Sequence, residues 1–159
     1  MKINRFFLIS IIILVLTINC KKRDDFPINN TPSNTTAKYK ELALLKGDTI
    51  AYNSLSRDYM DSPYEGFLYT ALIMANKHNY HLAFEDTYYC LTDYSHKAEF
   101  TELENLDEKT KSMALEYLKL GAERGNKECK KLLGHYYIEG KYLEKDIIKG
   151  KKLIDEGEK

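Results

Sequence analysis

Two histidines and a glutamate form the pattern in this sequence that is nearest to a metal site. His78 and His81 are three residues apart and Glu85 follows one helical turn later, so one helical face would present nitrogen and oxygen ligands. Asn79 interrupts this face, because asparagine tolerates the left-handed conformation that ends a helix. No further residue completes a ligand set, so we expect surface histidines, no metal site and no cofactor.

Adjacent carboxylates, a possible basis for acid–base chemistry, occur at residues 85–86 and 107–108. Neighbouring residues on a helix project about 100° apart, so we expect each pair to lie on a solvated helix face and not to share a site. The sequence contains no glycine-rich phosphate loop, serine nucleophile elbow or paired-cysteine zinc pattern. We therefore expect no catalytic residues and no enzymatic activity.

The three cysteines differ in their surroundings. Cys90 and Cys129 fall on apolar helical faces, where cysteine acts as a small core residue. Cys90 comes late in its helix and Cys129 early, at different heights on neighbouring hairpins, which argues against a disulfide between them. Cys20 instead follows an apolar segment near the N-terminus.

Residues 1–19 have the composition of a secretory signal. Lys2 and Arg5 precede an apolar run at 6–16 that only Ser10 interrupts, and Cys20 comes shortly after that run. The run is too short for a comfortable transmembrane helix, and a plain membrane anchor with an incidental cysteine is the alternative. The placement of Cys20 resembles the bacterial lipoprotein signal, which implies that Cys20 is lipidated and begins the mature chain.

Residues 20–37 are expected to form the lipidated cysteine and a flexible tether, because they are rich in Asn, Thr, Ser and Pro and poor in large apolar side chains. The charged run at 21–25 resembles the export signals of some surface lipoproteins, with a solvated charge run as the alternative. These features predict a lipid-anchored protein of the bacterial cell envelope, at the outer membrane, on its periplasmic or its surface face.

The remaining candidate residues must be positioned by helices. Residues 113–140 contain two runs of apolar and small residues at helical spacing, separated by Gly125 and Asn126. Gly125 suits the positive φ of a helix C-terminus and Asn126 suits the N-cap of the next helix, so an antiparallel hairpin is predicted. Gly121 and Gly134 lie inside these helices, where we expect them to allow close helix packing.

The same turn recurs 78 residues earlier, at Gly47 and Asp48. Five residues match at this offset, and the pairs are Tyr39 with Tyr117, Leu42 with Leu120, Ala51 with Cys129, Leu55 with Leu133, and Tyr59 with Tyr137. The interval accommodates two units of the ~34 residues found in tetratricopeptide-class repeats. A middle unit is predicted from a helical face within 67–75, a left-handed Asn79 and a second helix after it.

The predicted fold is all-α. It is a short solenoid of antiparallel helix hairpins, with about three repeats and a C-terminal capping helix, in one domain at residues 38–159. Residues 95–109 are polar and acidic and are expected to form a loop with a short turn, and residues 145–156 the final helix. No segment alternates apolar and polar residues over the length of a strand, so no sheet is expected.

Small and aromatic residues fall at fixed offsets in both helices of the last hairpin. They are Ala114, Tyr117, Leu118, Ala122, Glu123, Gly125, Asn126, Leu133, Gly134, Tyr137 and Gly140, followed by Asp146 and Lys149. This pattern resembles the Sel1-like repeat, a relative of the tetratricopeptide repeat; Cys129 stands where that family usually has alanine. The resemblance implies stacked helical hairpins that bind a partner protein as an adaptor or scaffold.

The charge balance argues against nucleic-acid binding. Residues 1–19 contain Lys2 and Arg5, so the mature chain has 22 of the 24 basic residues against 24 acidic ones, a net charge of −2. A bulk basic surface, which supplies most of the affinity for a phosphate backbone, is therefore not expected.

Thirteen tyrosines and no tryptophan leave more tyrosine than a small core requires. Tyrosine favours interfaces because its ring is apolar and its hydroxyl stays hydrated. We expect Tyr64, Tyr69 and Tyr88 to line a partner-binding groove formed mainly by the first helix of each hairpin, and Tyr59 and Tyr137 to pack within the repeats. The alternative function is that of an immunity protein whose groove neutralises a cognate toxin.

Overall fold

The computed structural model describes residues 34–61, 66–92 and 103–159. Contacts divide the chain into two compact units, Met1–Pro32 and Ser33–Lys159, and every described residue belongs to the second. Within the described ranges the secondary structure consists of seven α-helices and one 3-10 turn, without any strand. None of the described helices combines the length and the apolar character that a membrane span requires. The prediction of an all-α fold is confirmed.

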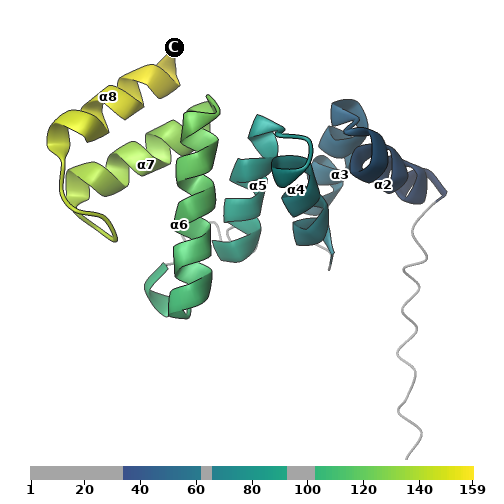
Figure 1. The fold of residues 1–159 in the computed structure, drawn as a ribbon, viewed down its shortest axis with the longest axis horizontal. Coiled ribbons are helices and arrows are strands. Elements are labelled where there is room, and N and C mark those ends of the chain that lie inside the picture. Colours follow the sequence, from purple (N-terminus) through teal and green to yellow (C-terminus); the bar gives the residue numbers. More distant parts are fainter. Residues whose placement is uncertain (1–33, 62–65, 93–102) are drawn as a thin grey trace, which may run out of the picture. The chain divides into compact units, whose positions relative to one another are not determined.

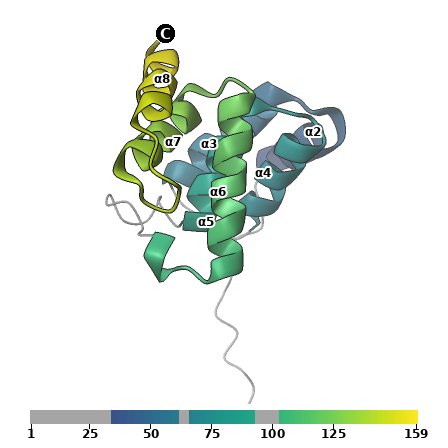
Figure 2. The same ribbon diagram turned by 60° about the vertical axis from the view of Figure 1, so that its left-hand side comes forward.

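The helices follow one another as hairpins (Figure 1). Their bounds are α2 Asn34–Lys46, α3 Thr49–Asp61, α4 Phe67–Asn76, α5 His81–Thr92, α6 Glu108–Glu123, α7 Lys127–Glu139 and α8 Ile147–Glu158, with the 3-10 turn η2 at Leu103–Asn105. Helices α2 and α3, α4 and α5, and α6 and α7 pack as sequential pairs, and α8 packs along α7 (Figures 1 and 2). This arrangement is consistent with a short helical repeat array.

The turns of the first and last hairpins share one chemistry, as the sequence repeat predicts. Gly47 and Gly125 adopt left-handed φ values of 68° and 84°, a region that side chains with a Cβ rarely enter. Asp48 Oδ1 then accepts hydrogen bonds from the backbone N–H groups of Ile50 and Ala51. Asn126 Oδ1 accepts one from Cys129 N at 2.8 Å. Each turn therefore ends one helix and caps the next.

The middle hairpin makes the same turn without glycine. Asn79 has φ 53°, as expected, and the bond from Tyr80 N to Met74 O closes the end of α4, as the bond from Asp48 N to Leu42 O closes α2. The ring of His78 is hydrogen-bonded to the carbonyl oxygen of Leu44 at 3.0 Å and lies against Gly47. His78 thus joins the second turn to the first, a packing role that differs from the surface position expected of it.

Glycines inside the helices mark close packing, which confirms the prediction for Gly121 and Gly134. A Cβ on Gly121 would lie 2.5 Å from the Sγ of Cys129 on the partner helix. A Cβ on Gly134 would lie 2.7 Å from the carbonyl oxygen of Gly150, and a Cβ on Gly150 would meet Gly134 O at 2.6 Å. The backbones of α7 and α8 are therefore in contact, and α8 covers the end of the array as the capping helix.

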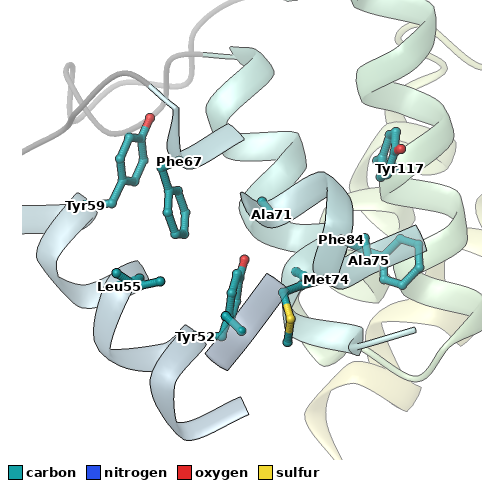
Figure 3. Close-up of a cluster of buried hydrophobic side chains, with 11 residues drawn as sticks. Tyr52, Leu55, Tyr59, Phe67, Ala71, Met74, Ala75, Phe84 and Tyr117 are labelled. Carbon is teal, nitrogen blue, oxygen red and sulfur yellow. The ribbon is translucent and has the colours of Figure 1, made fainter. Parts of the chain in front are cut away.

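Aromatic rings dominate the first of two core clusters (Figure 3). The ring of Phe67 stacks on Tyr59 with centroids 4.5 Å apart and on Tyr52 with centroids 5.8 Å apart. These side chains come from α3 and α4, so they join the first hairpin to the second. Full burial of one such ring stabilises a fold by about 1.5–3 kcal/mol. The second cluster joins α5, α6 and α7 around Leu118, Cys129 and Leu133.

Three boundaries differ from the sequence-based expectation. Helix α2 begins at Asn34, so residues 34–37 of the expected tether are helical. Helix α6 begins at Glu108, inside the expected loop, because Asp107 Oδ1 accepts hydrogen bonds from the N–H groups of Lys109 and Thr110. The final helix is Ile147–Glu158, displaced by two residues at each end.

The left-handed turn at Gly125 gives a test of the fold. Gly125→Val should lower the free energy of unfolding by at least ~1 kcal/mol, because a β-branched residue is strained at φ 84° although no atom lies within 4 Å of the added Cβ. Gly125→Asn is the matched control and should cost less, because asparagine tolerates this region. Urea unfolding followed by circular dichroism measures both. Equal stability of Val and Asn variants would show that Gly125 is not left-handed in solution.

Candidate functional site

The structure separates the tyrosines that were expected to bind a partner. Tyr69, on α4, is 61% exposed, which agrees with its expected position away from the packed face. Tyr64 lies outside the described residues, as does Cys20. Of the tyrosines that were predicted to bind a partner and that the structure describes, Tyr69 is thus the one with an exposed ring.

The expectation for Tyr88 is wrong. Its side chain is 2% exposed and packs in the second core cluster, and its hydroxyl lies 2.7 Å from that of Tyr136. Burial raises the pKa of the Tyr88 hydroxyl well above its ordinary value, so it stays neutral. Tyr88 belongs to α5, the second helix of its hairpin, and its side chain points into the core. Truncating this side chain would open a cavity in the core.

Helix α4 has an unusual composition for a helix with an open side. It carries no charged residue, and Phe67, Ala71 and Met74 are fully buried on its inner side. Its other side consists of apolar or uncharged residues, of which Leu68, Leu72 and Ile73 are partly exposed and Tyr69 and Asn76 are exposed. We call these five residues the α4 outer face. A helix that is apolar all round is normally covered on every side.

The α4 outer face ends against α6 at one polar contact. Asn76 Nδ2 donates to the hydroxyl of Tyr117 at 2.6 Å, and Tyr117 itself is 9% exposed. On α6, the exposed side chains that follow Tyr117 are charged and include Lys119 and Glu123. Partly exposed aliphatic side chains around an exposed tyrosine have the composition of the centre of a protein-binding surface.

A second feature is a pocket of about 230 Å³ between α3 and α5. Its lining residues are Asn53, Ser56 and Arg57 from α3 and Leu82, Glu85 and Asp86 from α5. Both α3 and α5 are second helices of their hairpins, whereas the expected groove is formed by first helices. The volume is below the range of about 300–1,000 Å³ that is typical of small-molecule sites.

Asp86 holds the two sides of this pocket together. Its Oδ2 accepts hydrogen bonds from the hydroxyls of Tyr52 at 2.7 Å and Ser56 at 3.2 Å. Burial raises the pKa of Asp86, and the bonds from Tyr52 and Ser56 oppose that shift. Tyr52 is fully buried, so its hydroxyl depends on this acceptor.

Glu85 makes the matching contact toward the third hairpin. Its Oε2 accepts a hydrogen bond from Asn126 Nδ2 at 2.8 Å, while burial raises the pKa of its carboxyl. Glu85 and Asp86 were expected on a solvated face, and this expectation is wrong because both side chains are half-buried. The expectation that the two carboxylates point apart agrees with their bonds, which go to Asn126 and to Tyr52 respectively. They line the same pocket, and each bonds to a different neighbouring hairpin.

The described cysteines are free thiols held in apolar surroundings. Burial raises the pKa of Cys90 to about 12 and that of Cys129 well above its ordinary value. Neither thiol forms a reactive thiolate near neutral pH. In the part of the chain that the structure describes, no group of three or more His, Cys, Asp or Glu side chains is placed to hold a metal ion.

No sequence signal identified the bonds from Tyr52 to Asp86 and from Glu85 to Asn126. These partners lie 34 and 41 residues apart, and their meeting depends on how successive hairpins stack. The sequence does contain two adjacent carboxylates, Glu85 and Asp86, on a predicted helix. The residues on either side of them, at 84 and 87, are buried in the structure. Such carboxylates lie at the edge of a buried face and are shielded from water.

The Asp86 contact predicts a specific dependence of stability on pH. The pKa of Asp86 is higher in the folded state than its ordinary value of 3.8, so protonation of this carboxyl favours the folded state. The resulting contribution to stability is complete below pH 3.8 and is lost as the pH rises through the folded-state pKa. Asp86→Asn should remove this contribution, so its free energy of unfolding should change less between pH 4 and neutrality than that of the unsubstituted domain.

Asp86→Ala provides the comparison. It leaves the buried Tyr52 hydroxyl without its acceptor and should lower the free energy of unfolding by about 1–3 kcal/mol at neutral pH, whereas Asp86→Asn keeps an acceptor oxygen. Urea unfolding at a series of pH values measures both. Parallel pH profiles for Asp86→Asn and the unsubstituted domain would contradict a raised pKa at Asp86.

Comparison of the chain with protein-family models, with curated proteins and with solved structures gives no match. The assignment therefore stays at an all-helical domain of sequentially paired helices, and function must be argued from the surfaces described above.

Proposed function

We propose that this protein is a lipid-anchored component of the bacterial envelope that binds a partner protein through the α4 outer face. The observation that carries the proposal is an uncharged helix that exposes Tyr69 beside the partly exposed Leu72 and Ile73. In a stably folded domain such a face is normally covered, and a partner would supply the cover.

The chemistry of this face suits a protein more than a small molecule. Tyrosine is among the residues that most often dominate binding energy, because its ring buries a large apolar area and its hydroxyl can still bond. Branched and aliphatic neighbours exclude water around such an anchor. The pocket described above lies between α3 and α5 and not at α4, so the partner would present its own apolar residues to an extended surface.

We propose further that the helices form Sel1-like repeats. The hairpin turn at Gly125 and Asn126 and the close contact at Gly121 support this, because the resemblance requires small residues and a tight turn at these positions. Ala114 and Ala122 are also buried between helices. Repeat arrays of this kind offer extended faces for binding, which agrees with the role proposed for α4.

The lipid anchor of the proposal is Cys20, and the location is the outer membrane. Support comes from the signal-like residues 1–19 and from the polar residues that follow Cys20. An immunity protein that neutralises a cognate toxin would use the same face, and identification of the captured partner distinguishes that role from a scaffold.

Tyr69→Ala tests the binding face. We expect this variant to weaken capture of the partner by ~2 kcal/mol or more, roughly thirtyfold, with nearly unchanged melting, because an exposed ring contributes to binding and little to the core. The measurement is a pull-down from solubilised membranes with residues 33–159 as bait, beside a melting curve of each bait.

Two controls define the result. Ile50→Ala removes a side chain that is 80% exposed on a different hairpin and should leave capture unchanged. Tyr52→Ala removes a fully buried ring and should lower the melting temperature, which Tyr69→Ala should not do. Capture that survives Tyr69→Ala at full strength would place the binding face elsewhere.

Cys20→Ala tests the anchor. The variant should lose incorporation of labelled palmitate and a large part of its membrane association, because the thiol that accepts the lipid is gone. Cys90→Ala is the matched control, since its thiol is half-buried on a helix of the folded domain and should not accept lipid. Equal labelling of the Cys20→Ala variant and the unsubstituted protein would exclude lipidation at Cys20.

A further inference from the structure

We propose that the segment 145–152, at the start of α8, docks this domain on the surface of an anionic phospholipid bilayer. The segment contains four lysines, one aspartate and two adjacent isoleucines in a chain whose formal net charge is zero. We call it the lysine–isoleucine segment. This contact is separate from the anchor proposed at Cys20 and does not depend on it.

The apolar part of the segment is exposed. Ile148 is 85% exposed, the highest value for a large apolar side chain among the described residues, and the adjacent Ile147 is 46% exposed. The opposite side of α8 is covered, because Gly150 and Gly157 bring the helix into backbone contact with α7. Packing within the domain thus leaves the two isoleucines on the outside.

The charged part surrounds Ile148. Lys151 and Lys152 follow it by three and four residues and so share its side of the helix, and both are exposed. Lys145 is exposed just before the helix begins. Lys149 points elsewhere, since its Nζ donates to the Tyr137 hydroxyl at 2.8 Å and lies 4.1 Å from the ring centroid.

The acidic groups nearby are mostly engaged. Asp146 Oδ1 accepts a hydrogen bond from Lys149 N as the N-cap of α8. Asp155 pairs with Lys159 at 2.8 Å, and Glu156 pairs with Lys130 at 2.8 Å and more distantly with Lys152 at 3.9 Å. Glu144 and Glu158 are exposed at the two ends of the region. Within 145–152 itself, four lysines stand against the single negative charge of Asp146, and this gives the lysine–isoleucine segment its excess of positive charge.

A bilayer fits this combination better than an acidic protein does. A protruding branched side chain needs either a complementary pocket or a fluid apolar medium, and the acyl boundary of a bilayer provides the second. Lysine stems can extend from the same helix so that their ammonium groups reach the lipid phosphates. Each lysine near an anionic surface strengthens binding about fivefold.

The test is co-sedimentation of residues 33–159 with lipid vesicles. This fragment keeps the whole second compact unit with both core clusters and omits the apolar run at 6–16. We expect it to sediment with vesicles of equal phosphatidylcholine and phosphatidylglycerol, to stay in solution with phosphatidylcholine alone, and to be released by high salt. Lys151→Glu with Lys152→Glu should weaken binding at least about tenfold, and Ile148→Ser about fivefold.

Matched controls come from the same domain. Ile50→Ser, which also changes a highly exposed isoleucine, and Lys119→Glu, on α6, should leave vesicle binding unchanged, as should Tyr69→Ala. Melting curves exclude unfolding of any variant. Three outcomes would each overturn the proposal: no binding to the anionic vesicles, equal binding to neutral vesicles, or an equal loss of binding in the control variants. If the domain does not bind anionic vesicles, an acidic protein is left as the partner of the lysine–isoleucine segment. None of these outcomes bears on partner capture through α4.

Discussion

The domain depends on one buried amide, that of Asn126. Its Oδ1 caps α7 by accepting from Cys129 N, while its Nδ2 donates to the carbonyl oxygen of His81 at 3.2 Å and to Glu85 at 2.8 Å. A side chain that is 1% exposed and makes three hydrogen bonds fixes the start of α7 against the start of α5. The same turn that shapes the third hairpin therefore also sets its position on the second.

Successive hairpins are joined by two kinds of contact. Aromatic stacking between Tyr52, Tyr59 and Phe67 joins the first hairpin to the second. Gly121 lets α6 of the third hairpin approach α5 of the second, because a Cβ on Gly121 would lie 3.0 Å from the Cβ of Phe84. Around these apolar contacts lie directional bonds, such as the one from Tyr52 to Asp86 across the first and second hairpins. Apolar burial supplies stability, and the bonds select one register of stacking.

The sequence predicted what depends on local geometry and failed where stacking decides. Gly47, Gly125 and Asn79 were recognisable because a residue that tolerates positive φ, placed between two helical runs, is typical of a hairpin turn. Tyr88 and Asp86 were not, because periodicity separates two sides of a helix without telling which side a neighbouring hairpin will cover. Both residues lie on α5, which has neighbours on both sides, and this extra coverage explains why its polar groups are more buried than the pattern implied.

The two proposed surfaces follow from the same reasoning about coverage. Helix α4 carries no charge although one side of it remains open, whereas α8 places lysines and two isoleucines on the side that α7 leaves open. An open apolar side is a liability for solubility unless something covers it, and lysines reduce that liability in α8 but not in α4. The uncharged α4 therefore fits a matching apolar protein surface, and the charged α8 fits contact at a wet interface between water and lipid.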